Sequence, residues 1–113
     1  MTSESLKATE ELGAKGATHP RVTLQDIENN IKAQYFINAK TAVEASGAPA
    51  VDELKMLNIC LLVTQNGFVT IGKSASASPE NYDEQKGQTF AHEDVIRQLW
   101  PVMSYALREK LAA

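Results

Sequence analysis

The pair Asn66-Gly67 constrains the fold of this chain more than any other feature of its sequence. Residues 58–64 before the pair are mostly apolar, and residues 68–71 after it are rich in β-branched and aromatic side chains. Asn-Gly favours the positive φ values that a type I′ turn requires at both central positions, and such a turn joins two antiparallel strands. The sequence therefore predicts a β-hairpin.

The first strand of this hairpin, residues 58–64, is apolar on both faces. This pattern is typical of strands that are covered on both sides of a sheet, and we expect the same here. A two-stranded hairpin is barely stable by itself. Another strand, or a second copy of the chain in a homo-oligomer, should therefore complete the sheet or cover its far face.

The segment before the hairpin predicts a long helix from Thr23 to about Ala45. Thr23 and Asp26 have the spacing of a capping box, in which each side chain accepts a hydrogen bond from the backbone of the other residue. Gly47 and Pro49 should end the helix. Between these signals, apolar side chains recur at three- and four-residue steps, as on one face of a helix: Leu24, Ile27, Ile31, Tyr35 and Ala39.

Shorter signals lie on either side of the hairpin. Residues 51–57 predict a short helical turn capped by Asp52. Residues 74–77 are all small and can either lie flat against another element or form a loop. Ser78-Pro79-Glu80 predicts the start of a long helix, because it combines a capping hydroxyl, a proline in the first turn and an acid at the positive end of the helix dipole. Pro101 should bend or break this helix near Trp100.

These elements predict an α+β fold with an N-terminal helix, a β-hairpin forming a small antiparallel sheet, and a long, bent C-terminal helix. Residues 21–113 should form one domain, since a chain of 113 residues has material for a single modest core. Residues 1–20 contain few large apolar groups and predict a flexible tail, or alternatively a segment that folds on a partner.

Composition argues against several classes of function. The formal charge is −3, from 11 basic and 14 acidic side chains without a basic cluster, so nucleic-acid binding is disfavoured. The longest apolar run, residues 59–63, is too short to cross a membrane. The single cysteine, Cys60, lies inside this run and predicts a buried, inert thiol. The start of the chain lacks the pattern of a secretory signal, which favours the cytoplasm.

The chain resembles a family of small tailed-phage proteins named for gene product 49 of one coliphage and gene 66 of a Shigella phage. The similarity covers about 90 of the 113 residues and is sharpest over residues 72–83. The resemblance implies a phage or prophage origin and an accessory role in the host cytoplasm, and it supplies no catalytic residue. The other matching segments are residues 21–23, 26–28, 35–36, 39, 60–63, 66–68, 100–103 and 105–108.

The order of hairpin, small-residue loop and helix also resembles the core of nucleoside deaminases, and we tested the sequence for their zinc site. That site needs a His or Cys followed two residues later by Glu, and a later pair of cysteines. His92-Glu93-Asp94 has Asp in place of that Glu, and the later cysteines are missing. Adjacent helical side chains also point about 100° apart, so these three predict a solvated helix face. We therefore expect neither a metal or other cofactor nor an enzyme.

Two groups of side chains are candidates for an interaction surface. The first is the polar cluster at the predicted helix start, which either holds the preceding loop or binds a ligand or partner. The second lies on the last helix, where aromatic side chains are either core residues or interface anchors; there we expect Trp100 to be in the core. The candidate residues are Glu80, Asn81, Tyr82, Asp83, Tyr105 and Arg108.

The function that these observations favour is a small phage accessory protein that binds a host or phage protein during host takeover or counter-defence. One alternative is a module that binds a small molecule or nucleotide, with a deaminase-like shape and without zinc. A second alternative is a component of virion assembly.

Overall fold

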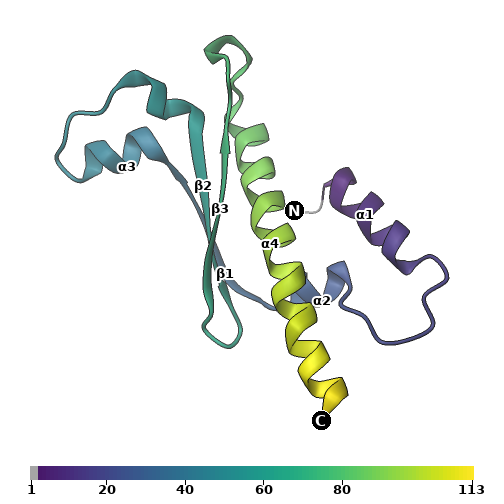
Figure 1. Cartoon of the computed structure of the whole chain (residues 1–113). Helices are drawn as coiled ribbons and strands as arrows, with labels where there is room; N and C mark the ends of the chain where they lie inside the picture. The colour runs from purple at the N-terminus through teal and green to yellow at the C-terminus, as the bar shows by residue number, and fades with distance from the viewer. Residues whose placement is uncertain (1–2) are drawn as a thin grey trace.

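The computed structural model describes residues 3–113 and shows an α+β fold, as expected (Figure 1). Its three strands form one sheet, and the long helix α4 lies along one face of that sheet. Within residues 3–113, none of the helices has both the length and the apolar character needed to cross a lipid bilayer. The elements in chain order are α1 (Glu4–Ala14), α2 (Leu24–Asn29), β1 (Ile31–Asn38), α3 (Ala39–Ala45), η1 (Asp52–Met56), β2 (Leu57–Thr64), β3 (Val69–Ala75), η2 (Pro79–Asn81) and α4 (Glu84–Ala112).

The predicted hairpin is present as β2 and β3, and β1 adds a third strand on the other side of β2. The strand order is β1-β2-β3, with antiparallel pairing throughout. Leu61 in the middle of β2 pairs with Tyr35 of β1 and with Ile71 of β3. The sheet is therefore completed within the chain, and both outer strands present an edge.

The turn of the hairpin differs from the predicted type. Gly67 has φ of 87°, but Asn66 does not have a positive φ, so the type I′ prediction was wrong. The Gly67 N–H donates to Thr64 O at 2.9 Å, and the Thr64 N–H donates to Phe68 O at 2.9 Å. This is a three-residue connection in which glycine takes the left-handed position. Asn66 Oδ1 accepts from the Phe68 N–H at 3.1 Å and so holds the turn instead.

The prediction of one helix over residues 23–45 was wrong for its central residues, 30–38. The capping box at Thr23 and Asp26 forms as expected, but α2 ends at Asn29. Strand β1 follows, and α3 then covers residues 39–45. Residues 31–38 contain isoleucine, tyrosine and phenylalanine, which favour strands, and pairing with β2 satisfies the backbone groups on one side of this outer strand. The short helical turn predicted over residues 51–57 is present as η1, although the Asp52 side chain does not cap it.

The described part of the predicted tail, residues 3–20, contains helix α1. Leu6 on this helix is fully buried in the core. The Glu10 carboxylate accepts a hydrogen bond from the Leu24 N–H at the start of α2 and pairs with Arg21. Arg97 of α4 donates to the Ser5 hydroxyl at 2.6 Å. The buried Leu6 and these polar contacts thus attach α1 to the domain; the domain boundary at residue 20 stays a prediction.

Helix α4 begins later than predicted and passes through its proline. Asp83, not Ser78, caps it: Asp83 Oδ1 accepts from the Lys86 N–H at 3.0 Å. Pro79 instead begins the short 3₁₀ turn η2. Pro101 lies inside the helix, which continues to Ala112. The residue is exposed, so its missing hydrogen bond lies on the solvent side and the helix does not break there.

The core lies between α4 and the face of the sheet that α4 covers. Gly72 of β3 faces α4 at very short range: a Cβ atom built there would lie 2.3 Å from Ala91 O and 2.7 Å from Val95 N. Asp94 of the same helix accepts from the Lys73 N–H at 2.9 Å, on the edge of β3. The buried apolar residues of this cluster are Leu6, Val22, Leu24, Ile27, Cys60, Leu62, Ala91, Val95, Ile96 and Leu99, and Trp100 packs against them as expected.

Candidate functional site

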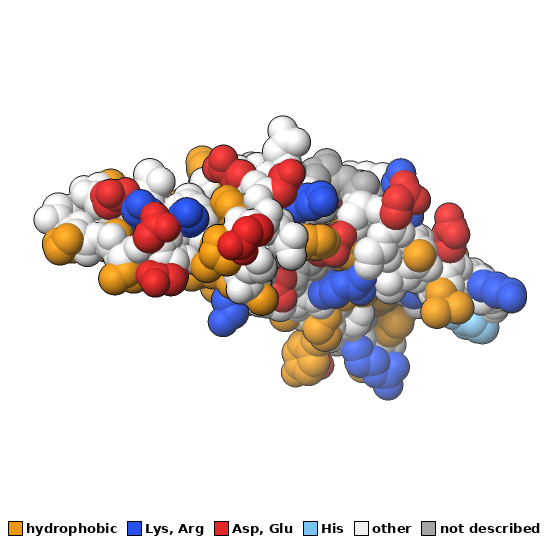
Figure 2. Space-filling model, turned by 90° about the horizontal axis from the view of Figure 1, so that it is seen from above, with side chains coloured by type: hydrophobic (Ala, Val, Ile, Leu, Met, Phe, Trp, Pro, Cys, Tyr) orange, Lys and Arg blue, Asp and Glu red, His pale blue; other side chains and the backbone are white. Residues whose placement is uncertain are grey.

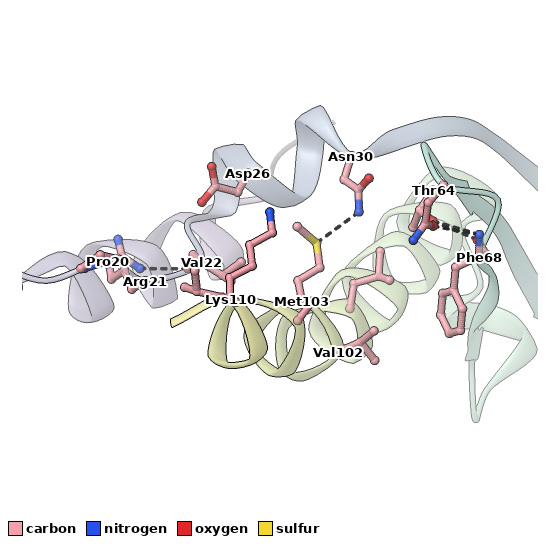
Figure 3. A pocket seen from close by; sticks show the side chains of 14 residues that line it. Pro20, Arg21, Val22, Asp26, Asn30, Thr64, Phe68, Val102, Met103 and Lys110 are labelled. Carbon is pink, nitrogen blue, oxygen red and sulfur yellow. Dashed lines mark hydrogen bonds between the residues drawn. The ribbon is translucent and has the colours of Figure 1, made fainter. Parts of the chain in front are cut away.

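A groove lies between α2, the hairpin turn and the second half of α4 (Figure 3). It has a volume of about 380 Å³, which is within the range of small-molecule sites and large enough for one or two apolar side chains of a protein partner. Its lining residues are Pro20, Arg21, Val22, Asp26, Asn30, Thr64, Asn66, Phe68, Leu99, Val102, Met103, Ala106, Leu107 and Lys110.

The walls of the groove are held together by hydrogen bonds between elements that are far apart in the sequence. Asn30, at the end of α2, donates from Nδ2 to Met103 Sδ at 3.5 Å, and its carbonyl accepts from the Gln65 N–H at 2.9 Å. Trp100 Nε1 donates to Val22 O at 3.0 Å. The groove is therefore formed by the folded chain before any partner is present, which lowers the entropy cost of binding.

The chemistry of the groove is an apolar floor with a few charges at its opening. Leu99 in the floor is buried, whereas Phe68 and Val102 at the rim are 47% and 44% exposed. Asp26 and Lys110 reach the opening from opposite sides (Figure 3). The groove thus fits an apolar group flanked by groups of both charges.

The second exposed surface is the face of the sheet that α4 does not cover. Along β2, residues 58, 60, 62 and 64 are buried under α4, and the alternate residues 57, 59, 61 and 63 are only partly buried. Tyr35 on β1 and Ile71 on β3, which flank Leu61, are 59% and 50% exposed. The expectation that residues 58–64 are covered on both sides was therefore wrong for the single chain, because its helix layer lies on one side only.

The structure divides the predicted interaction surface into two parts. Glu80, Asn81, Tyr82 and Asp83 lie just before the N-terminus of α4. The second part, with Tyr105, lies about 33 Å further along the same helix, at 1.5 Å per residue. These six side chains therefore cannot contact one compact group together.

The first part of that surface makes contacts within the chain. The Tyr82 hydroxyl accepts from Asn58 Nδ2 at 3.0 Å, and Asp83 caps α4. The Ser78 hydroxyl donates to the Glu80 carboxylate at 2.7 Å, and this hydrogen bond lowers the pKa of Glu80. Asn81, next to them, is exposed. These contacts favour the interpretation that the polar cluster holds the preceding loop in place.

The second part lies beside the groove. Tyr105 is 70% exposed. Arg108 lines a shallow neighbouring hollow that shares Val22 and Leu107 with the groove. Sequence reasoning missed the groove itself, including Phe68 at its rim. The aromatic side chain directly after Asn66-Gly67 was the available signal, since a large side chain at a hairpin turn is exposed unless another element covers it.

The segment His92-Glu93-Asp94 does not form the predicted solvated face, because His92 is 3% exposed. Its Nδ1 is hydrogen-bonded to Gln34 Oε1, and the Cys60 thiol lies 3.5 Å from the same oxygen. Cys60 is buried as predicted, and burial raises the pKa of its thiol to about 11, which disfavours the reactive thiolate. Residues 3–113 contain no group of three or more His, Cys, Asp or Glu side chains placed to hold a metal ion.

Side-chain charge is mixed on the face seen from above. Figure 2 shows acidic and basic side chains next to each other, with hydrophobic side chains between them, at the end formed by α3 and η1. In that region Lys40 and Lys55 each lie 3.0 Å from a carboxylate oxygen of Asp52. The Lys40–Asp52 pair joins α3 to η1, whereas the Lys55–Asp52 pair lies within η1.

The fold and its two apolar surfaces define a small α+β protein built from a three-stranded antiparallel sheet and one long helix. The comparisons with known proteins add a family. The chain belongs to the family described as Phage protein (N4 Gp49/phage Sf6 gene 66), whose model matches residues 22–111. Curated proteins and solved structures gave no match. Helix α1 and its buried Leu6 precede the matched segment.

Proposed function

We propose that this protein is a phage accessory protein that binds a host or phage protein in the host cytoplasm, during host takeover or counter-defence. The groove beside α4 is the proposed binding site, and its apolar floor and exposed rim are the observation that supports this function. Membership of a phage family supports the phage setting. Aromatic side chains such as that of Phe68 at the rim are enriched in protein interfaces relative to the rest of the surface.

The proposed occupant is a segment of the partner that carries a large apolar side chain between an acidic and a basic group. The apolar side chain would displace water from the floor near Leu99. The acidic group would face Lys110 and the basic group would face Asp26, two of the charged side chains that line the groove (Figure 3). Because the walls are already held in place, binding requires little rearrangement of this chain.

A capture experiment with matched variants tests this proposal. The tagged full chain is expressed during phage infection, and copurifying proteins are identified by mass spectrometry. Val102→Glu places a charge at the groove rim, and Leu12→Glu places the same charge on α1, where Leu12 is 76% exposed. We expect a partner that Leu12→Glu retains and Val102→Glu loses, followed by at least about tenfold weaker binding of the purified partner to Val102→Glu. Equal capture by both variants would contradict the proposal.

The groove volume of about 380 Å³ also favours one alternative, a module that binds a small molecule or nucleotide. Native mass spectrometry of freshly purified protein distinguishes the two functions. A native mass above that of the denatured chain would favour the small-molecule alternative if the Met103→Glu variant loses this additional mass. A native mass equal to the chain mass or a multiple of it would favour protein binding.

A further inference from the structure

We propose that the uncovered face of the sheet is the interface of a symmetric dimer of this chain. This face, called the open face below, follows from the strand register, because directly paired residues share one side of a sheet. It consists of Ala33, Tyr35 and Ile37 of β1; Leu57, Ile59, Leu61 and Val63 of β2; and Val69, Ile71, Lys73 and Ala75 of β3.

The open face is apolar and still accessible to solvent. Val69 is 66% exposed, Tyr35 is 59% exposed and Ile71 is 50% exposed. Lys73 is the one charged member, and it lies on an outer strand, from which its long side chain can reach water at the rim. A continuous apolar surface of this kind is unusual on a monomer and typical of an association site.

The area of the open face is close to what a stable dimer requires. Three strands spaced about 4.8 Å apart, over about seven residues at 3.3 Å each, have a flat footprint of about 330 Å² per chain. Two such footprints give about 670 Å² in total, and the exposed side chains of Tyr35, Val69 and Ile71 add further accessible surface toward the roughly 1,000 Å² of a specific interface. Addition of a few residues from the rim would bring the area into the ordinary range.

A second copy of the chain is the occupant that the chemistry of this face favours. A face with almost no charge does not select a partner by electrostatic complementarity. Homodimer interfaces are the class of interface that most resembles a hydrophobic core. Two sheets also pack well face to face, about 10 Å apart, when alternating aliphatic side chains such as Ile59 and Leu61 interdigitate. The dimer would give β2 the two-sided cover that its sequence predicts.

The resulting dimer has four layers, with the two sheets inside and the two α4 helices outside. The grooves beside α4 remain on the outer surfaces, because α4 and the open face lie on opposite sides of the sheet. The dimer therefore does not depend on the proposed binding function. It would present two grooves, so a partner with two copies of the binding segment would bind with avidity.

Sedimentation velocity of the full chain over a wide concentration range tests the dimer. Ile71→Lys places a charge in the centre of the open face, and Leu111→Lys is the matched control, because Leu111 on α4 is 53% exposed, close to Ile71 at 50%. We expect the wild type and Leu111→Lys to be dimers, and the dissociation constant of Ile71→Lys to rise by roughly 30-fold or more. A monomeric wild type at all concentrations would overturn the proposal, as would equal weakening by Leu111→Lys.

A second measurement needs no variant and covers the case in which Ile71→Lys fails to fold. Methyl NMR with a soluble paramagnetic probe reports directly which methyl groups are accessible. We expect the methyl groups of Leu61 and Ile71 to become protected as the concentration rises, whereas those of Leu111 stay accessible. Full accessibility of Leu61 and Ile71 at high concentration would overturn the dimer, and it would leave the groove proposal unaffected.

Discussion

At the scale of single residues, the contact between α4 and the sheet depends on the absence of a side chain at Gly72. The helix backbone at Ala91 and Val95 occupies the place where a Cβ would lie. Backbone atoms cannot rotate away as the end of a side chain can, so any larger residue must push the two elements apart. The glycine thus sets the distance between helix and sheet, and with it the depth of the core.

Gly72→Ala should therefore lower the free energy of unfolding by about 1–3 kcal/mol, through overpacking. Urea denaturation measures this loss. Gly67→Ala is the control: its Cβ would meet open space, and it should cost about 1–2 kcal/mol through its left-handed φ alone. Only Gly72→Ala should also shift the amide resonances of Ala91 and Val95. Unchanged resonances in that variant would refute the close contact.

Tyr82 is the residue of the predicted polar cluster whose hydroxyl has a clear structural role. It accepts from Asn58 Nδ2 at 3.0 Å, and Asn58 is 1% exposed. Tyr82→Phe leaves that buried donor without this acceptor and should cost about 1–3 kcal/mol of stability. Tyr105→Phe alters a hydroxyl on a side chain that is 70% exposed, so thermal or urea unfolding should show a change within about 0.5 kcal/mol. Equal losses in the two variants would contradict the buried role.

At the scale of elements, the sequence predicted those that depend on local signals and misassigned β1, which depends on pairing with a distant strand. Asn66-Gly67 marked the hairpin correctly because turn chemistry acts over a few residues. The spacing of Ile31, Tyr35 and Ala39 by four residues fits one face of a helix, but the register shift after Ile31 places Ile31 against the core and Tyr35 on the open face, and Ala39 lies in α3. The strand-favouring side chains of residues 31–38 and their pairing with β2 make this segment a strand. The pairing partner cannot be inferred from residues 31–38 alone.

The attachment of α3 to η1 gives a prediction about pH. Hydrogen bonds from Lys40 and then Lys55 lower the pKa of Asp52 below its ordinary value. A carboxyl group with a lowered pKa in the folded state adds stability above its ordinary pKa, and this contribution disappears as the pH falls through the folded-state pKa. NMR titration should show the lowered pKa of Asp52, and Lys40→Met should raise it. An unchanged titration in that variant would show that the ion pair does not form in solution.

At the scale of the whole molecule, α1 contributes to the core although it precedes the segment that defines the family. Leu6→Ala should lower the free energy of unfolding by about 2–5 kcal/mol, because it leaves a cavity beneath the helix. Leu12→Ala, on the same helix but 76% exposed, should change it by less than about 0.5 kcal/mol. Chemical denaturation of both variants gives the comparison. A neutral Leu6→Ala would indicate that the segment behaves as the tail that its composition predicts.

The two proposed binding surfaces could not be predicted from the sequence, because distant segments form each of them. Phe68 and Val102 meet in one groove only after α4 has crossed the sheet. Tyr35 and Ile71 share the open face only through the register of β1 and β3 with β2. The candidates chosen from the sequence were neighbours along the chain, and a long helix then carried Tyr105 away from Tyr82.

The hydrogen bond from the Lys73 N–H to Asp94 also affects how many copies of the chain can join. A sheet with two outer strands can add chains edge to edge, and pairing of the β3 edge with the β1 edge of the next copy would never close, so it would grow into a fibre. Asp94 occupies a donor on the β3 edge and makes that pairing less favourable. An acidic side chain on α4 thus opposes growth of the sheet from one copy of the chain to the next and favours small, closed assemblies.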